Sequence, residues 1–172
     1  MKYIKAMIAV IILTLLDQLT KFLAVTHLKV APAIPVIKDV FELQYLENRG
    51  SAFGMMQNQR VFFIIITIVI VAAFVWIYIR TPRTRRMVPL NILCVFIVSG
   101  ALGNFIDRLL HGYVVDFFYF KLIDFPIFNV ADIYVTLSAA ALIILGLFYY
   151  KEEDFDTIFK KKSDRKHIQN EV

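Results

Sequence analysis

The sequence predicts an all-α membrane protein with four transmembrane helices and a small extracytoplasmic β element. Hydrophobic residues make up 59% of its 172 residues, which is more apolar side chain than one soluble core of this size can bury. Three uncharged stretches reach about 20 residues, the length of a helix that crosses the hydrocarbon core. Most Lys and Arg residues lie between or beyond these stretches. We therefore expect the bilayer to surround most of the chain.

The four spans are predicted at residues 4–25, 61–79, 87–106 and 133–150. A cleaved signal peptide is the alternative for the first, which contains three charged residues, but no small-x-small cleavage site follows its apolar run. Read as a helix, this segment carries its polar residues on one face, which we expect to look into the bundle. They are Thr14, Asp17, Gln18 and Lys21.

The distribution of positive charge predicts the orientation. Twelve Lys and Arg residues lie at the N-terminal side of the first span, between the second and third, or after residue 150, against six in the other two connections. By the positive-inside rule, both termini are cytoplasmic. Residues 1–150 then form one transmembrane domain and residues 151–172 a charged, solvated cytoplasmic tail. A nucleic-acid partner is not expected, because the basic residues form no stripe interleaved with aromatic ones.

The β element is predicted in the first outer connection. Residues 41–45 alternate apolar and polar side chains, which is the pattern of a short amphipathic strand. Pro32 and Pro35 precede it as breakers, and Gly50 and Gly54 follow it. We expect this strand to rest on the outer membrane surface.

The single cysteine, Cys94, lies in an apolar run and is expected to be a packed core thiol. It can form neither an intrachain disulfide nor a thiolate zinc site. The histidines, His27, His111 and His167, are single residues in loops or the tail, so no Ser, His and acid constellation is predicted.

Ionisable residues in or beside the spans need a partner or a task, because charge in lipid is costly. Asp17 and Lys21 are four residues apart on the first helix, and a structural ion pair explains both. We expect Asp17 to support a site at the outer face rather than to react itself.

A second polar segment runs from Asn48 to Gly54. A tight turn, which Gly50 and Gly54 allow, is one interpretation. The other is that the Asn48 amide and the loop amides bind an extended peptide.

The third group ends the third span, where Ser99 and Gly103 form a small-xxx-small pair for close helix packing. Asn104, Asp107 and Arg108 share one helical face beyond it. Arg108 either snorkels toward water or stands beside carboxylates and lowers the pKa of those nearest it.

The fourth group flanks the start of the last span. Asn129 and Asp132 are spaced as an N-cap and its third helical position, which needs no catalytic role. Asp116 has no such explanation, because it is an isolated charge in the apolar and aromatic run 113–120.

Under the predicted topology all these groups except the deeper Asp17 and Lys21 converge on the outer mouth of the bundle. Two carboxyl groups that share a site do not both ionise easily, so one serves as a base and the other keeps a proton. This division suits peptide hydrolysis. The alternatives are an ion pathway, a Ca²⁺ or Mg²⁺ site built from Asp107, Asp116, Asp132 and Asn129, and a non-catalytic assembly factor.

Five segments resemble the signature segments of the bacterial lipoprotein signal peptidase (type II) family, in the family's order over most of the chain. They are residues 17–21, 48–54, 100–108, 114–117 and 128–132.

The resemblance implies a four-span aspartyl endopeptidase in the bacterial plasma membrane, with Asp116 and Asp132 as the catalytic dyad and no metal or cofactor. Its substrates would be diacylglyceryl-modified prolipoproteins, cut immediately before the lipidated cysteine at the outer face. Membrane lipids and peptide inhibitors of the globomycin type are the other implied partners, and a monomer is expected. The resemblance also implies substrate-binding or supporting roles for eight further residues, which are Asn48, Gly50, Asn104, Asp107, Arg108, Asn129, Asp17 and Lys21.

Overall fold

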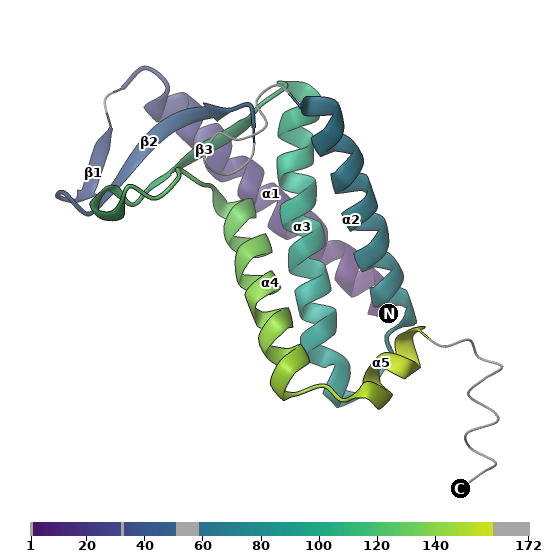
Figure 1. The fold of residues 1–172 in the computed structure, drawn as a ribbon. Coiled ribbons are helices and arrows are strands. Elements are labelled where there is room, and N and C mark those ends of the chain that lie inside the picture. Colours follow the sequence, from purple (N-terminus) through teal and green to yellow (C-terminus); the bar gives the residue numbers. More distant parts are fainter. Residues whose placement is uncertain (1, 32, 51–58, 160–172) are drawn as a thin grey trace, which may run out of the picture.

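A computed structural model describes residues 2–31, 33–50 and 59–159, which form a helical bundle with a small sheet at one end (Figure 1). Four helices are long and apolar enough to cross a membrane, as predicted. Pro32, residues 51–54 of the predicted turn and residues 160–172 of the predicted tail lie outside the described residues.

The helices differ from the predicted spans mainly at their ends. α4 begins at Val130, three residues before the predicted start, because Asn129 caps it, and it ends at Phe148. α3 ends at Leu110, two residues after Arg108 and four after the predicted end of the span. α1 extends beyond the predicted span at both ends. The bounds are α1 Lys2–Leu28, α2 Arg60–Arg80, α3 Val88–Leu110, α4 Val130–Phe148 and α5 Glu152–Phe159, with 3-10 turns at Arg85–Met87 and Lys121–Ile123.

α3 is the central helix, with α1, α2 and α4 packed around it (Figure 1). Ser99, Gly100 and Gly103 are all buried on α3, which confirms the predicted small-residue face. Thr14 of α1 donates to the Ser99 carbonyl oxygen at 3.4 Å where these helices cross. Small residues allow this close approach because their side chains have little bulk. In lipid, where the hydrophobic effect does not drive helix association, such close packing stabilises the bundle.

The outer surfaces of the helices are apolar, as lipid contact requires. α2 buries only Thr67 among its residues, and that hydroxyl donates to the Phe63 carbonyl oxygen of the same helix. Large side chains such as Leu147 and Phe148 are exposed on α4. A polar route through the depth of the bundle, as an ion pathway needs, finds no support on α2.

The sheet has three antiparallel strands in the order β1 (Ile34–Ile37), β2 (Phe41–Asn48) and β3 (Val114–Tyr119). β2 confirms the strand predicted from alternation. Pro35 lies within β1 rather than breaking the chain before the sheet; the prediction was wrong because an edge strand tolerates proline. β3 was not predicted as a strand, since its first four residues are all buried and show no alternation.

The first part of the tail is a helix, contrary to the prediction of a solvated appendage. α5 buries Ile158 in a cluster with Met87, Leu90, Cys94 and Tyr150, which confirms Cys94 as a core thiol. Asp154 of α5 also binds Arg86 at 2.8 Å. The start of α1 and all of α5 lie at the end of the bundle opposite the sheet (Figure 1).

The helix packing yields a testable difference between two glycines. A methyl group at Gly100 would lie 2.5 Å from the Ala131 carbonyl oxygen and 2.8 Å from Val135 Cγ2, whereas one at Gly146 meets nothing within 4 Å. We predict that Gly100→Ala destabilises the protein by about 1–3 kcal/mol through overpacking. Gly146→Ala is the matched control and should be neutral or slightly stabilising. Thermal unfolding in detergent micelles measures both; equal midpoints would contradict the packing at Gly100.

Candidate active site

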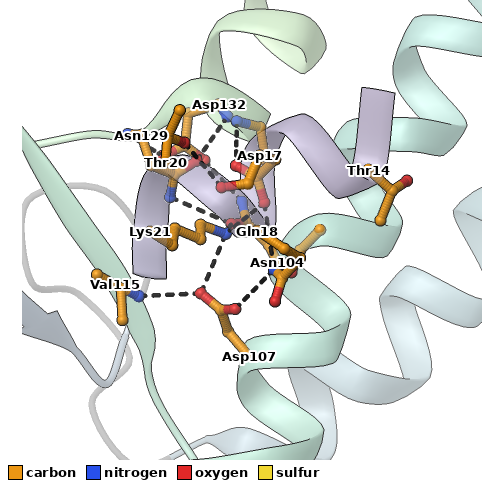
Figure 2. Close-up of polar contacts among 12 residues, drawn as sticks. Thr14, Asp17, Gln18, Thr20, Lys21, Asn104, Asp107, Val115, Asn129 and Asp132 are labelled. Carbon is orange, nitrogen blue, oxygen red and sulfur yellow. Dashed lines mark hydrogen bonds and ion pairs between the residues drawn. The ribbon is translucent and has the colours of Figure 1, made fainter. Parts of the chain in front are cut away.

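Lys21 is the centre of a buried polar network between α1 and α3 (Figure 2). Its ammonium lies 2.9 Å from Asp17 Oδ2 and 3.0 Å from Asp107 Oδ2, and it donates to Asn104 Oδ1 at 2.8 Å. The three donors of the ammonium therefore meet three acceptors. The prediction of an Asp17–Lys21 ion pair is confirmed, and Asp107 joins it.

Two carboxylates against one ammonium leave excess negative charge, which further N–H donors offset. Gln18 Nε2 donates to Asp107 Oδ1 at 2.9 Å and to the Gly103 carbonyl oxygen at 3.1 Å. The Val115 N–H of β3 donates to Asp107 Oδ2 at 3.1 Å. Buried charges need such partners for every lone pair. Asp107 thereby attaches β3 to α3.

The start of α4 is held by the same network. The Ala131 N–H donates to Asp17 Oδ1 at 2.8 Å. This N–H belongs to the first turn, where the helix itself provides no acceptor and where negative charge is favoured. Asp17 and Lys21 were predicted to lie deeper than the other site residues, with Asp17 in a supporting role. The structure corrects their separation, because they bond directly to Asp107, Asn104 and the start of α4.

Asn129 and Asp132 form a capping box at this helix start, as the spacing predicted. The Asp132 N–H donates to Asn129 Oδ1 at 3.0 Å, and the Asn129 N–H donates to Asp132 Oδ2 at 3.1 Å. The fully buried Asn129 side chain also donates from Nδ2 to Asp116 Oδ1 at 2.6 Å. One residue thus caps the helix and connects two carboxyl groups.

Asp116 reaches this point through strand pairing. In the antiparallel register, Asn48 lies opposite Val114 and Leu46 opposite Asp116, so Asn48 and Asp116 are diagonal neighbours on one face. Asn48 Nδ2 donates to Asp116 Oδ2 at 2.8 Å. Burial and the nearby Asp132 charge raise the pKa of Asp116 to about 7, against the two amide donors, which favour the ionised form.

Asn104 connects the lysine network to the second carboxyl group. Its Oδ1 accepts from Lys21 and, at 3.2 Å, from Asn129 Nδ2. Its Nδ2 donates to Asp132 Oδ1 at 2.8 Å. Each oxygen of Asp116 and of Asp132 therefore accepts one hydrogen bond within the described residues.

Asp116 and Asp132 line one cavity of about 200 Å³ at the sheet end of the bundle. Arg108 also lines it, and its guanidinium donates to the Gly50 carbonyl oxygen at 3.3 Å and lies 4.7 Å from the Phe63 ring centre. Arg108 therefore does not simply snorkel to water. The other lining residues are Asn48, Asn104, Val114, Phe125, Pro126, Ile127, Phe128 and Thr136.

The structure brings together all ten predicted site residues, although only five of them line the cavity. Asn129, Asp17, Lys21 and Asp107 lie behind it, and Gly50 meets it through Arg108. The Gly50 N–H donates to Asn48 Oδ1 at 3.0 Å, so the turn interpretation holds for the described start of that segment.

The predicted set missed two side chains and an apolar wall. Gln18 could have been predicted from its place on the polar face of α1. Thr136 could also have been predicted, because it follows Asp132 by four residues on α4 and so lies on the same helical face. The wall formed by residues 125–128 gave none, because aromatic residues near a span end are common.

The residues proposed as an alternative Ca²⁺ or Mg²⁺ site divide between two places. Asp107 binds Lys21 and β3, while Asp116 and Asp132 open to the cavity. Within residues 2–31, 33–50 and 59–159, no three His, Cys, Asp or Glu residues are arranged to hold a metal ion.

Fold and site together define a multi-pass membrane protein with a pair of carboxyl groups on the wall of one cavity. Two solved structures described as bacterial membrane enzymes share the fold, one with a TM-score of 0.74 and 32% identity over 92% of each chain. The other has a TM-score of 0.71 and 33% identity, and covers 86% of this chain and 94% of that one.

The family model described as Signal peptidase (SPase) II matches residues 8–148. The lipoprotein signal peptidase of Halothermothrix orenii is 47% identical over 137 residues, which are 80% of this chain and 91% of that protein. The lipoprotein signal peptidase of Streptococcus pyogenes is 38% identical over 148 residues, 86% of this chain and 94% of that protein. The chain belongs to the signal peptidase II family and is a peptidase.

The network predicts a large effect of one lysine. Lys21→Met leaves Asp17 and Asp107 buried without their cation, and we expect a loss of about 3–5 kcal/mol in the free energy of unfolding. Lys29→Met removes an exposed lysine that pairs with Glu47, and it should change the free energy of unfolding little, because solvent screens an exposed ion pair. Chemical unfolding in mixed micelles compares the two. Equal losses would show that Lys21 is not the electrostatic centre of the bundle.

Proposed function

We propose that this chain is an intramembrane aspartyl endopeptidase that removes signal peptides from diacylglyceryl-modified prolipoproteins, cutting immediately before the lipidated cysteine. Asp116 and Asp132 are the catalytic dyad. The observation that carries the proposal is that Asn129 bonds both carboxyl groups at the wall of one cavity. Membership of the signal peptidase II family and the names of the relatives support the substrate class.

The two aspartates divide the chemistry. Asp116 keeps a proton near neutral pH, since its pKa is raised to about 7, and it donates that proton to the scissile carbonyl oxygen or the leaving amine. Asp132 acts as the base that takes a proton from the attacking water. Its place in the first turn of α4 favours its negative charge. Asn48, Asn104 and Asn129 fix the orientation of the carboxyl groups through their amides.

The position of the cavity suits a lipid-anchored substrate. Acyl chains hold the modified cysteine at the membrane surface, so binding in lipid supplies proximity before the chemistry starts. Asn48, Asn104 and Arg108, which line the cavity, are the groups that contact the peptide backbone, or a cyclic peptide inhibitor of the globomycin type. Asn129 lies behind the cavity and acts on the substrate through the two carboxyl groups that it bonds. The apolar wall 125–128 shields the scissile bond from bulk water.

We further propose that the sheet end faces outward and that both termini are cytoplasmic. The start of α1 and α5 share one end of the bundle. Lys2, Lys5, Arg83 and Arg85 lie together at that end, which the positive-inside rule assigns to the cytoplasm. The active site then opens at the outer face, where precursors emerge after export. The enzyme acts as a monomer in this scheme, since all the proposed site residues come from one chain.

We predict that Asp116→Asn and Asp132→Asn each lower cleavage of a lipidated precursor by about 100-fold to 10,000-fold, the range that one general acid or base contributes. Each change keeps the shape of the side chain and removes the carboxyl chemistry. Cleavage is followed by the mobility shift of the precursor on gels, with membrane insertion checked in parallel.

Asp124→Asn is the matched control for these two variants. Asp124 is exposed outside the cavity, accepts from the Tyr119 hydroxyl at 2.7 Å and has a positive φ of 46°, which asparagine also tolerates. It should process precursor at the normal rate. Normal processing by either dyad variant would refute the assignment.

The pH dependence gives a second test of the division of roles. Because Asp116 loses its proton as the pH rises through about 7, kcat/KM for the lipidated precursor should fall above that pH. A series of initial rates in micelles between about pH 5 and pH 9 measures this decline. A rate that keeps rising through pH 8 would assign the acid role to another group.

A further inference from the structure

A large groove lies at the opposite end of the bundle from the candidate active site. It has a volume of about 780 Å³ and runs between the first half of α1 and the first half of α3. Its deep part is apolar, with walls formed by Ala9, Ile12, Leu13 and Phe96. An apolar lining of this kind is suited to contact with an acyl chain.

The mouth of the groove is cationic. Lys2, Lys5, Arg83 and Arg85 line it, and no acidic residue is among its lining residues. Lys2 is already engaged, since it donates to the carbonyl oxygens of Tyr78 and Thr81 at 3.2 Å and 3.1 Å. Lys5 and Arg85 are exposed and have no hydrogen-bond or ion-pair partner within the described ranges.

A second groove on another face of α1 provides an internal comparison. It measures about 430 Å³ and is lined by apolar and aromatic side chains with no Lys or Arg. Both grooves offer apolar surface, but only the first offers positive charge for a headgroup. The combination of apolar depth and cationic mouth therefore distinguishes the first groove from ordinary lipid-facing surface.

We propose that the groove between α1 and α3 binds an anionic phospholipid, with its phosphate at Lys5 and Arg85 and one acyl chain along Ala9 and Ile12. Basic residues near the membrane surface attract anionic headgroups, each by a modest energy. The signal peptide of a substrate is a poor occupant, because its own N-terminal region is positively charged and the groove mouth would repel it.

One polar side chain of the groove wall, Asn91, has an acceptor oxygen without a partner within the described residues. Asn91 Nδ2 donates to the Met87 carbonyl oxygen at 2.8 Å. Its Oδ1 is buried and has no hydrogen-bond partner within the described residues. A hydroxyl-bearing anionic lipid such as phosphatidylglycerol supplies both the anion and a donor.

The test measures lipid retention rather than peptidase activity, so it is independent of the proposed function. Purified full-length protein is mixed with phosphatidylglycerol or phosphatidylcholine at equal concentration, and retained lipid is counted by native mass spectrometry. The wild type should retain phosphatidylglycerol roughly tenfold more strongly. The double variant Lys5→Gln/Arg85→Gln should lose this preference, while inorganic phosphate should not displace the lipid.

Two matched controls make the result specific. Arg80→Gln/Lys151→Gln removes two positive charges at the same end of the bundle but outside the groove, and should keep the preference. Ala9→Phe fills this groove and should abolish retention, whereas Val10→Phe fills the second groove and should not. Equal retention of both lipids, equal loss in the charge control, or unchanged retention in Ala9→Phe would overturn the proposal.

Discussion

The hydrogen-bonded ion pairs of Lys21 are the interaction on which the rest of the structure depends. The ammonium joins Asp17 of α1 to Asp107 and Asn104 of α3. Through Asp17 the network reaches the first turn of α4, and through Asp107 it reaches β3. Four elements are therefore positioned by one buried cation, in an environment where any unpaired member would be strongly destabilising. α4 and β3 in turn position the two carboxyl groups at the cavity, Asp132 on α4 and Asp116 on β3.

The difference between these carboxyl groups follows from the elements that carry them. Asp132 is part of a capping box, so its oxygens accept from a backbone N–H and an amide at the positive end of a helix. Asp116 lies on a strand that is buried at this point, and among the described residues it accepts from two side-chain amides. Structural and chemical interpretations of Asn129 are consequently not alternatives. The residue that caps α4 is also the one that orients Asp116.

Much of the fold could be predicted because helices that cross a bilayer need long apolar segments, which are visible in the sequence. The spans followed from apolar length, and the inward face of α1 from four polar residues at helical spacing. The start of α4 was misplaced by three residues although its capping residues had been recognised, since apolar length was given precedence over the cap. β3 and α5 were missed for different reasons. A strand buried on both faces shows no alternation, and eight residues are too few to establish helical periodicity in a charged tail.

The site was predicted as a set of residues but not as an arrangement. Spacing within one helix can place Asn104, Asp107 and Arg108 on one face, yet it cannot reveal that Asn48 meets Asp116 across a sheet. That contact depends on the register of β2 and β3, which no local pattern encodes. The raised pKa of Asp116 has the same origin, because it requires both the burial of β3 and the nearby charge of Asp132.

α1 connects the two ends of the molecule. Near its start Lys2 binds carbonyl oxygens of Tyr78 and Thr81, at its middle Thr14 meets Ser99, and in its second half Asp17 and Lys21 enter the network. Between the first two attachments, residues of α1 and α3 line the groove. A phospholipid bound there, as proposed, would support α1 along the stretch where side chains of α3 leave the groove open. The position of α1 in turn sets where Asp17 and Lys21 lie, so the proposed lipid groove and the proposed active site share one helix.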